Sequence, residues 1–161
     1  MSAARPAATG QHFLRSPALA KRIVADAGVP GGALVFDIGA GFGRLTLPLL
    51  ETGARVIAVE IDAKLARSLQ RRCPDARVVC DDALRIPLPH RPFRVVANLP
   101  FGISTAMLRR LSASPYLERA DLIVARGFAL KSGLPVSRWL PRRAFMPPPS
   151  TDCAVLVLQR R

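Results

Sequence analysis

The sequence predicts an α/β domain of the Rossmann type, with a mostly parallel central sheet and helices on both faces. Three observations predict it. Apolar runs of strand length alternate with amphipathic segments of helix length, a glycine-rich turn follows the first buried run, and polar residues follow the later ones. Such alternation is typical of right-handed βαβ units. A chain of 161 residues has the length of one ordinary domain.

The first half of the chain is expected to alternate regularly. Ser16 is placed to cap the first helix, and the apolar run Leu34–Ile38 has the pattern of a strand buried on both faces. The elements expected are a flexible segment at 1–10, a helix at 16–27, a strand at 34–38, a helix ending near Gly53 after the turn at 39–43, a strand at 55–60, a helix at 63–72 and a strand at 77–80.

The second half begins in the same way and then weakens. The elements expected are a strand at 93–98, a helix at 104–111, a strand at 121–125 and a closing strand at 154–158. Residues 132–151 carry five prolines and are expected to be mostly loop. No internal repeat or second domain is visible, so residues 11–161 are expected to form one catalytic domain without a further C-terminal domain.

The composition points to a nucleic-acid partner. The chain has 24 Lys+Arg against 11 Asp+Glu, a formal charge of +13. Most of the basic residues are arginines, whose planar fork suits phosphate and stacks on bases. The alternatives are an acidic membrane surface as partner and a merely solvated basic surface. No run is long enough to span a membrane, and residues 1–10 lack the core of a secretion signal.

The cysteines do not suggest a metal or disulfide site. Cys73, Cys80 and Cys153 lie far apart, are odd in number and lack metal-ligand spacing. They are interpreted as reduced thiols. Reduced thiols are typical of a cytoplasmic protein. We further expect a monomer that binds neither membrane nor metal.

The turn after the first strand suggests a cofactor site. Glycines at 39, 41 and 43 allow a sharp turn and a close approach of the backbone to a ligand. The dinucleotide pattern needs a further glycine where Arg44 stands, so a ligand without a pyrophosphate fits better. Glu60 ends the second strand, where an acid can bind ribose hydroxyls, and Asp82 follows the third, within reach of an adenine amino group. The alternative for each residue alone is an ordinary turn or cap.

The tetrapeptide Asn98-Leu99-Pro100-Phe101 ends the fourth strand at the same edge of the sheet. Pro100 fixes its own φ and restricts Leu99, which projects the Asn98 amide and exposes a backbone carbonyl. Two acceptors aimed at one NH₂ group favour the pyramidal form in which an exocyclic amine is nucleophilic, and Phe101 offers a face for stacking a base. Proximity then supplies much of the acceleration without a base or metal. The alternative is a turn in which Asn98 caps the next helix.

Taken together, these motifs resemble those of the rRNA adenine N6-methyltransferases, which include the erythromycin-resistance enzymes and the small-subunit dimethylases. The resemblance covers about residues 10–131 and 141–158. The matching pieces are Gly10-Gln11-His12-Phe13-Leu14, Asp37-Ile38-Gly39-Ala40-Gly41, Val59-Glu60-Ile61-Asp62, Asn98-Leu99-Pro100-Phe101 and Phe145-x-Pro147-x-Pro149. The stretch Arg94–Ala106 is most similar to the actinomycete resistance enzymes.

The resemblance implies a class I methyltransferase fold, S-adenosylmethionine as cofactor and an rRNA adenine as substrate, methylated once or twice at N6. It implies that Asn98, Leu99, Pro100 and Phe101 form the catalytic turn. The cofactor-binding residues that it implies are Gln11, His12, Leu14, Gly39, Ala40, Gly41, Glu60, Ile61, Asp82 and Asn98.

The resemblance leaves the substrate open. The first reading is methylation of 23S rRNA, which confers resistance to macrolides, lincosamides and streptogramin B. The alternatives are a 16S rRNA dimethyltransferase, a methyltransferase for DNA adenine or protein glutamine, and a catalytically weak RNA-binding relative. Two departures stand out: the protein is expected to lack the family's small C-terminal helical domain, and the segment after Ala125 is short. A helix covering one sheet face is therefore expected to be lost or replaced by 132–139.

Overall fold

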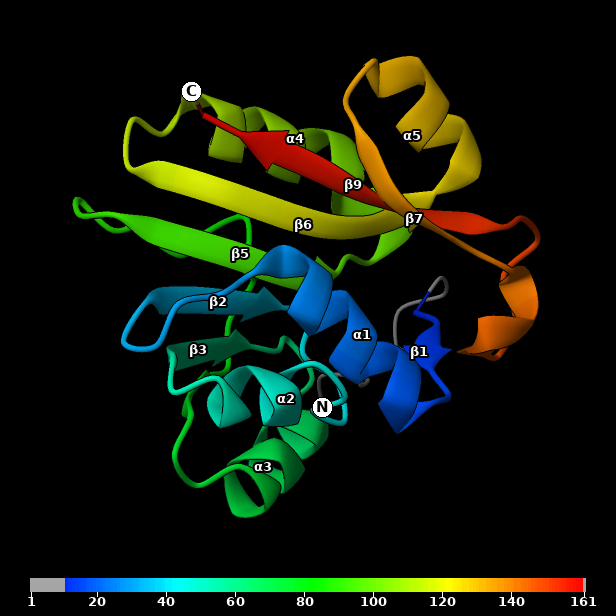
Figure 1. Ribbon diagram of the computed structural model, residues 1–161. Helices are drawn as coiled ribbons and strands as arrows, with labels where there is room; N and C mark the ends of the chain where they lie inside the picture. Colours follow the sequence, from blue (N-terminus) through cyan, green and yellow to red (C-terminus); the bar gives the residue numbers. More distant parts are fainter. Residues whose placement is uncertain (1–10, 161) are drawn as a thin grey trace, which may run out of the picture.

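A seven-stranded sheet runs through the centre of the protein (Figure 1). The structure is a computed structural model that describes residues 11–160; the segment expected to be flexible at 1–10 lies outside them. The strand order is β4-β3-β2-β5-β6-β9-β7, with the first five parallel and β9 antiparallel to both of its neighbours. The strands are β2 (Leu34–Ile38), β3 (Arg55–Val59), β4 (Arg77–Val79), β5 (Phe93–Asn98), β6 (Leu117–Ala125), β7 (Val136–Leu140) and β9 (Cys153–Gln159).

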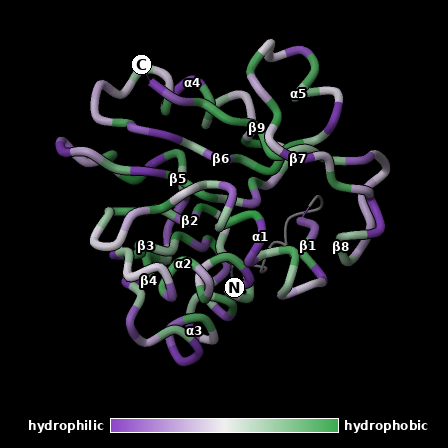
Figure 2. The backbone as a smooth tube through the Cα atoms, viewed as in Figure 1, coloured by the Kyte–Doolittle hydropathy of each residue, from purple (hydrophilic) through white to green (hydrophobic). Residues whose placement is uncertain are grey.

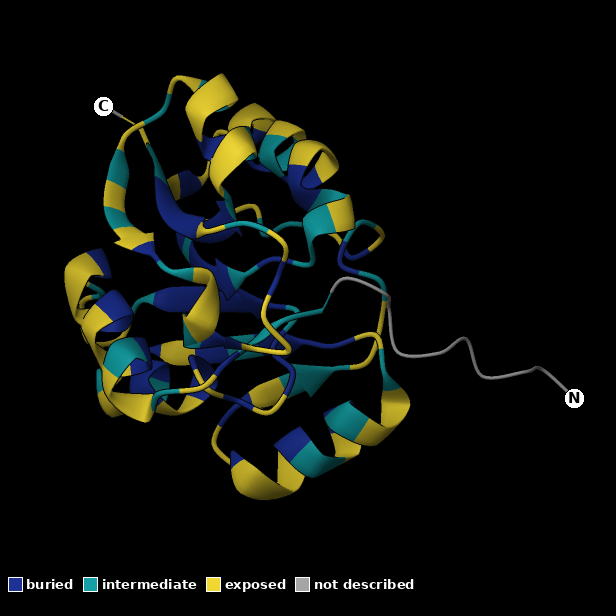
Figure 3. Ribbon diagram, turned by 90° about the vertical axis from the view of Figure 1, so that its right-hand side faces the viewer, coloured by how far each residue is buried: buried dark blue, intermediate teal, exposed yellow. Residues whose placement is uncertain are grey.

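Helices cover both faces of this sheet, as predicted. The α-helices are α1 (Pro17–Ala27), α2 (Thr46–Glu51), α3 (Ala63–Arg72), α4 (Ser104–Ala113) and α5 (Arg126–Ser132). Alternate residues of β2 serve two separate cores. Val35 joins the core under α1, α2 and α3, whereas Leu34 and Phe36 join the core under α4 and α5. The hydrophobic strands lie inside and the helices turn exposed faces outward (Figures 2 and 3).

Local signals explain where several helices begin and end. The Ser16 hydroxyl accepts a hydrogen bond from the Leu19 N–H at the start of α1, and Gly28 closes that helix with a φ of 58°. Asp62 caps α3 by accepting from the N–H groups of Lys64 and Leu65. The helix after the glycine turn is shorter than expected, because residues 39–45 form turns before α2 begins at Thr46.

The region predicted to be mostly loop contains a strand, so that part of the prediction was wrong. β7 lies at the edge of the sheet and pairs with β9 from Val136 to Leu140. The prolines of this region lie outside the strand, and its residues alternate between partly buried and exposed up to the buried Leu140. The sequence analysis expected a helix that covers one sheet face to be lost or replaced by residues 132–139. The structure has the short helix α5 and the strand β7 in this region.

The fifth parallel strand also begins earlier than expected, at Leu117. Its first half is polar, which hid it from a search for apolar runs. The Arg119 guanidinium binds the buried Asp121 carboxylate at 2.8 Å, so the two charges neutralise each other along the strand.

A second, two-stranded sheet joins the start of the described chain to the segment just before β9. β1 (Phe13–Leu14) pairs antiparallel with β8 (Phe145–Met146), and the Arg15 N–H donates to the Ala144 carbonyl at 3.0 Å. A short 3-10 helix, η2 (Arg142–Ala144), precedes β8. Two pieces of the family resemblance, 130 residues apart in the sequence, are thereby brought side by side. This pairing holds residues 11–14 beside the carboxyl ends of the parallel strands.

We expect only one of the three cysteines to react readily in the native protein. Cys73 and Cys153 are buried, whereas Cys80 is exposed. Burial raises the pKa of the Cys153 thiol to about 11, and burial also raises the pKa of Cys73. Titration with a chromogenic disulfide reagent should therefore count one fast thiol in the native protein and three after denaturation. Three fast thiols in the native protein would contradict the packing described for β9 and α3.

Candidate active site

The backbone N–H groups of the glycine loop after β2 donate hydrogen bonds to acceptors of the protein itself. The N–H groups of Gly39 and Ala40 donate to the Val59 carbonyl at 2.8 and 3.1 Å, and Gly41 N–H donates to Glu60 Oε1 at 2.9 Å. A phosphate cradle needs such donors free. The loop is therefore built for a ligand without a pyrophosphate, as its sequence predicts.

Two of these glycines also sit where a side chain would not fit. Both have positive φ, 71° at Gly39 and 55° at Gly41. A Cβ at Gly39 would lie 3.0 Å from Pro100 Cδ, and one at Gly41 would lie 2.7 Å from Phe13 Cε1. The loop is thus packed directly between the Asn98–Phe101 turn and the segment at 11–14.

A cavity of about 200 Å³ opens beside this loop at the carboxyl ends of β2, β3 and β4. It brings together residues that the sequence analysis named at successive strand ends: Gly39, Glu60, Ile61 and Asp82. Ile61 is 65% exposed and offers an apolar surface at the mouth. The complete lining is Gln11, Ile38, Gly39, Val59, Glu60, Ile61, Asp81, Asp82, Ala83, Leu84, Pro100 and Ile103.

Glu60 is the central polar group of this larger cavity. It is 1% exposed, and its two oxygens accept from the N–H groups of Gly41 and Asp62, both at 2.9 Å. Gln11 Nε2 lies 3.4 Å from Glu60 Oε1, a long contact. One carboxylate thus joins the glycine loop, the end of β3 and the segment at 11–14. Removing it would leave buried donors unpaired.

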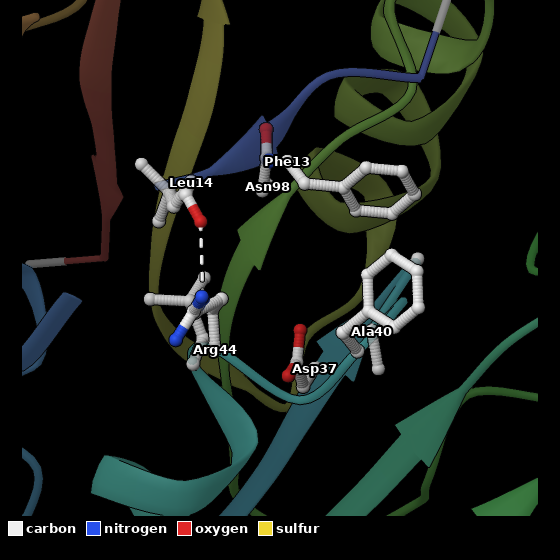
Figure 4. A pocket seen from close by; sticks show the side chains of 9 residues that line it. Phe13, Leu14, Asp37, Ala40, Arg44 and Asn98 are labelled. Atoms are coloured by element: carbon white, nitrogen blue, oxygen red, sulfur yellow. Dashed lines mark hydrogen bonds between the residues drawn. The ribbon is translucent and has the colours of Figure 1, made fainter. Parts of the chain in front are cut away.

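A second, smaller cavity of about 20 Å³ lies on the other side of Gly39, which lines both. Figure 4 shows Phe13, Leu14, Asp37, Ala40, Arg44 and Asn98 around it. Arg44 Nε donates to the Leu14 carbonyl at 3.1 Å, and the rings of Phe13 and Phe42 lie 4.8 Å apart. A carboxyl group and a guanidinium thus share the wall of one small cavity.

Asp37 is buried at the end of β2 and lies in this wall. Burial is the main reason that the pKa of its carboxyl rises from 3.8 to about 7, and the nearby Glu60 charge contributes to the rise. The Thr46 hydroxyl, which donates to Asp37 Oδ2 at 2.7 Å, acts in the opposite direction. Asp37 thus changes protonation near neutral pH.

The raised pKa predicts a pH-dependent stability. Between about pH 4 and 7 the folded protein holds a proton on Asp37 that the unfolded chain has released, so the free energy of unfolding falls as pH rises through this window. Asp37→Asn keeps an acceptor for Thr46 but removes the titration. In thermal melts from pH 4.5 to 8, the wild type should lose stability relative to the variant as pH rises. A difference in Tm that stays constant with pH would contradict the burial of Asp37.

The Asn98–Phe101 turn contributes to both cavities and contacts the segment at 11–14. Asn98 lines the smaller cavity and Pro100 lines the larger one. Asn98 Nδ2 donates to the His12 carbonyl at 2.6 Å, which leaves Asn98 Oδ1 as an acceptor. Leu99 is 2% exposed and packs in the core, so a role in catalysis falls to its backbone carbonyl. Within the described residues no group donates to that carbonyl. The half-buried Phe101 lies 5.4 Å from the His12 ring.

The segment at 11–14 is fixed from the C-terminal side of the chain. His12 Nδ1 lies 2.6 Å from the Pro147 carbonyl, so the Nδ1–H tautomer donates there. His12 itself lines neither cavity, and neither do Gly41, Leu99 or Phe101. The structure therefore does not bring these four into a cavity wall, whereas the other named residues lie in one.

Sequence reasoning missed several lining residues. Asp37, Arg44, Phe13 and Phe42 line the smaller cavity, and Ile103 closes the larger one. Asp37 was quoted within its motif, but nothing local signals that its side chain is buried. Arg44 had a usable signal, since it follows the glycine turn directly.

The described residues offer no site for a metal ion and no membrane-spanning helix. No group of three or more His, Cys, Asp or Glu side chains in 11–160 is placed to hold a metal. No helix in that part of the chain is both long and apolar enough to cross a membrane.

Solved structures with a similar fold are methyltransferases. The 23S rRNA methyltransferase ErmE superposes with a TM-score of 0.85 and 29% identity, covering 92% of this chain and 70% of that one. A dimethyladenosine transferase from Plasmodium falciparum gives a TM-score of 0.84 at 25% identity, covering 93% and 64%. The fold thus places the chain in the structural class of the class I methyltransferases.

The sequence comparisons narrow this class to one family. The profile of the family described as ribosomal RNA adenine dimethylase matches residues 5–138. The ribosomal RNA small subunit methyltransferase A of Synechococcus sp. (strain JA-3-3Ab) is 38% identical over 184 residues, covering 94% of this chain and 66% of that protein. The rRNA adenine N-6-methyltransferase of Corynebacterium diphtheriae is 33% identical over 170 residues, covering 94% and 67%. The chain belongs to the ribosomal RNA adenine dimethylase family.

The chain spans only part of its curated relatives. It covers 66% of the Synechococcus protein and 40% of a Leifsonia xyli relative that is 47% identical over 111 residues. The prediction of one catalytic domain over 11–161, without a C-terminal helical domain, stays a prediction.

Proposed function

We propose that this protein methylates N6 of an adenine in 23S rRNA, with S-adenosylmethionine as methyl donor. The observation that carries the proposal is the position of the acceptor turn. The turn packs against Gly39, which lines both cavities: a Cβ there would lie 3.0 Å from Pro100 Cδ and 3.4 Å from the Asn98 backbone carbonyl, while Asn98 Oδ1 and the Leu99 carbonyl are free acceptors of the same turn. A donor spanning the two cavities would pass directly in front of them.

The residues present fit this cofactor. The larger cavity offers the Glu60 carboxylate for ribose hydroxyls, Ile61 for the flat face of an adenine and Asp82 for its amino group. Gln11, whose contact with Glu60 is long, would give way to a hydroxyl. The smaller cavity offers Asp37 and Arg44 for the ammonium and carboxylate of an amino-acid tail. When bound, S-adenosylmethionine supplies a methyl group activated by a sulfonium.

The chain's own residues prepare the acceptor. The lone pair of an adenine N6 is delocalised into the ring, so the amine is a poor nucleophile in its planar form. Asn98 Oδ1 and the Leu99 carbonyl would accept its two hydrogens and favour the pyramidal form, while Phe101 would hold the base by stacking. N6 would then form a bond to the methyl carbon as the bond from that carbon to the donor sulfur breaks, which leaves a neutral thioether, and the surplus N6 proton would pass to water. Orientation supplies most of the acceleration, so no general base is needed.

The choice of 23S rRNA rests on likeness to the resistance branch. The stretch around Asn98 is most similar to the actinomycete resistance enzymes, and ErmE is 29% identical. On this proposal the protein confers resistance to macrolides, lincosamides and streptogramin B, and acts in the cytoplasm as a monomer. The second candidate is dimethylation of 16S rRNA, favoured by the 38% identity to a small-subunit methyltransferase.

Primer extension distinguishes the two. Protein, labelled S-adenosylmethionine and free 23S or 16S transcript are incubated, and each RNA is then copied. Dimethylation at N6 blocks base pairing, so we expect a stop at a single adenine of the 23S transcript. A stop in the 16S transcript alone would move the protein to the small-subunit branch. Label in neither RNA, under conditions where the donor binds, would contradict both candidates.

A further inference from the structure

A basic surface with one exposed aromatic ring lies beyond the two cavities. We call it the arginine patch and define it as Arg126, Trp139, Arg142 and Arg143. All four residues are exposed, Trp139 by 52%. The Arg126 guanidinium carbon lies 6.0 Å from the centre of the Trp139 ring. A ring and a guanidinium set side by side offer a stacking face next to a positive charge.

The patch is held in place by Asp152 rather than by its own charges. The Asp152 backbone carbonyl accepts from the Arg126 N–H at 2.9 Å, and its Oδ1 accepts from the Arg142 N–H at 2.8 Å. Arg126, Trp139 and Asp152 line one open cavity of about 440 Å³. Because both bonds use backbone N–H groups, the guanidinium groups remain available to a ligand.

The Asp152 carboxylate offsets part of the charge of this surface, but no guanidinium of the patch forms an ion pair within the described residues. The four ion pairs found there bind Lys21, Arg94, Arg119 and Arg138. None of them includes an arginine of the patch. With a formal charge of +13 for the whole chain, unpaired arginines gathered at one place attract a polyanion.

The patch flanks the acceptor turn. Asn98 at the end of β5 pairs with Ile123 of β6, and Arg126 follows the end of β6. Arg126 lies three residues after Ile123, the residue of β6 that pairs with Asn98. The Cα atoms of Asn98 and Arg126 are therefore separated by a distance on the order of 10 Å. The other end of the patch reaches the segment at 11–14, since the Arg15 N–H donates to the carbonyl of Ala144, next to Arg143.

We propose that the arginine patch binds the RNA strand next to the target adenine, with the arginines on phosphates and Trp139 stacked on an unpaired base. The proposal rests on the proposed function in one respect, that the substrate is RNA. Sequence-specific RNA recognition targets unpaired bases, which need both a stacking surface and phosphate contacts. The patch combines the two at the edge where the adenine must enter.

Trp139 is the only tryptophan of the chain, so its fluorescence reports directly on the patch. Titration with a 20-nucleotide single-stranded RNA should quench it, with an affinity that falls as salt rises, by a slope of about −0.7 per phosphate contact. The double variant Arg142→Gln/Arg143→Gln should bind at least tenfold more weakly and lose about 1.4 from that slope. Trp139→Ala, followed by anisotropy of labelled RNA, should also bind about tenfold more weakly.

Arg77→Gln/Arg91→Gln is the matched control. It removes the same charge from two exposed arginines. Arg77 begins β4 and Arg91 precedes β5, so both lie at the amino ends of parallel strands, whereas the patch lies beyond the carboxyl ends. The control should leave quenching, affinity and salt slope unchanged. Equal weakening by both pairs would overturn the proposal, because binding would then follow net charge alone. Quenching by phosphatidylglycerol vesicles without quenching by RNA would overturn it in favour of a membrane surface.

Failure of the surface and failure of the function are separable. Patch variants that methylate rRNA with an unchanged KM for RNA would reject the patch and leave the proposed function intact. Wild-type protein that shows RNA-dependent quenching, with the expected loss in the Arg142→Gln/Arg143→Gln variant but no methyl transfer, would support the patch and reject the function.

Discussion

Asn98→Ala is expected to slow methyl transfer by about 10²- to 10³-fold, the loss typical of removing one preorganised polar group from a reacting centre. The variant loses the Oδ1 acceptor that would hold the target amine, while Leu99 and its carbonyl stay fixed by the core. Single-turnover transfer from labelled donor to RNA, both saturating, measures the chemical step. Affinity for the donor, measured by calorimetry, should fall much less than the rate of transfer, because Asn98 lines only the smaller cavity and the larger one is untouched.

The second measurement separates two roles of Asn98. Its Nδ2 also donates to the His12 carbonyl and so anchors the segment at 11–14. If Asn98→Ala weakens donor binding as much as it slows transfer, Asn98 acts by holding that segment rather than the amine. Wild-type turnover by the variant would contradict both roles.

Glu60→Gln is expected to weaken donor binding by about 10- to 100-fold, the loss that corresponds to hydrogen bonds with a charged acceptor. The carboxylate accepts from the N–H groups of Gly41 and Asp62. An amide in its place would turn an NH₂ group toward one of these donors and open the glycine loop. Calorimetric titration with S-adenosylmethionine measures the effect, and the Tm should fall as well because Glu60 is buried.

Glu51→Gln serves as the control for this variant. Glu51 is the exposed end residue of α2 and makes a surface ion pair with Lys21 at 3.6 Å. The same change of charge there should alter neither donor affinity nor Tm measurably. Glu60→Gln with wild-type donor affinity would show that the larger cavity does not bind the ribose.

Much of the fold follows from local pattern. The strands β2 and β5 lie where their apolar runs predicted, because a strand buried on both faces must be apolar at nearly every position. Glu60 and Asp82 were found at the cavity because the ends of parallel strands meet at one edge, so positions far apart in the sequence become neighbours.

Other features depend on contacts that no local pattern encodes. β7 is an edge strand that is defined by its pairing with β9, and no local pattern signals that pairing. The prolines on either side of it made the segment resemble a loop. β1 and β8 have two residues each and become visible only when paired. The burial of Asp37 and Leu99 likewise depends on which helices cover the sheet. The burial of these two side chains was therefore out of reach of the sequence alone.

Nucleoside mass spectrometry tests the proposed chemistry most directly. A free rRNA transcript is incubated with the protein and S-adenosylmethionine carrying a deuterated methyl group, then digested to nucleosides. We expect deuterated N6-methyladenosine or N6,N6-dimethyladenosine with wild-type protein, and a strongly reduced yield with Asn98→Ala. Deuterium on any other nucleoside, or equal yields from the two proteins, would contradict the assignment of Asn98 to an adenine N6 acceptor site.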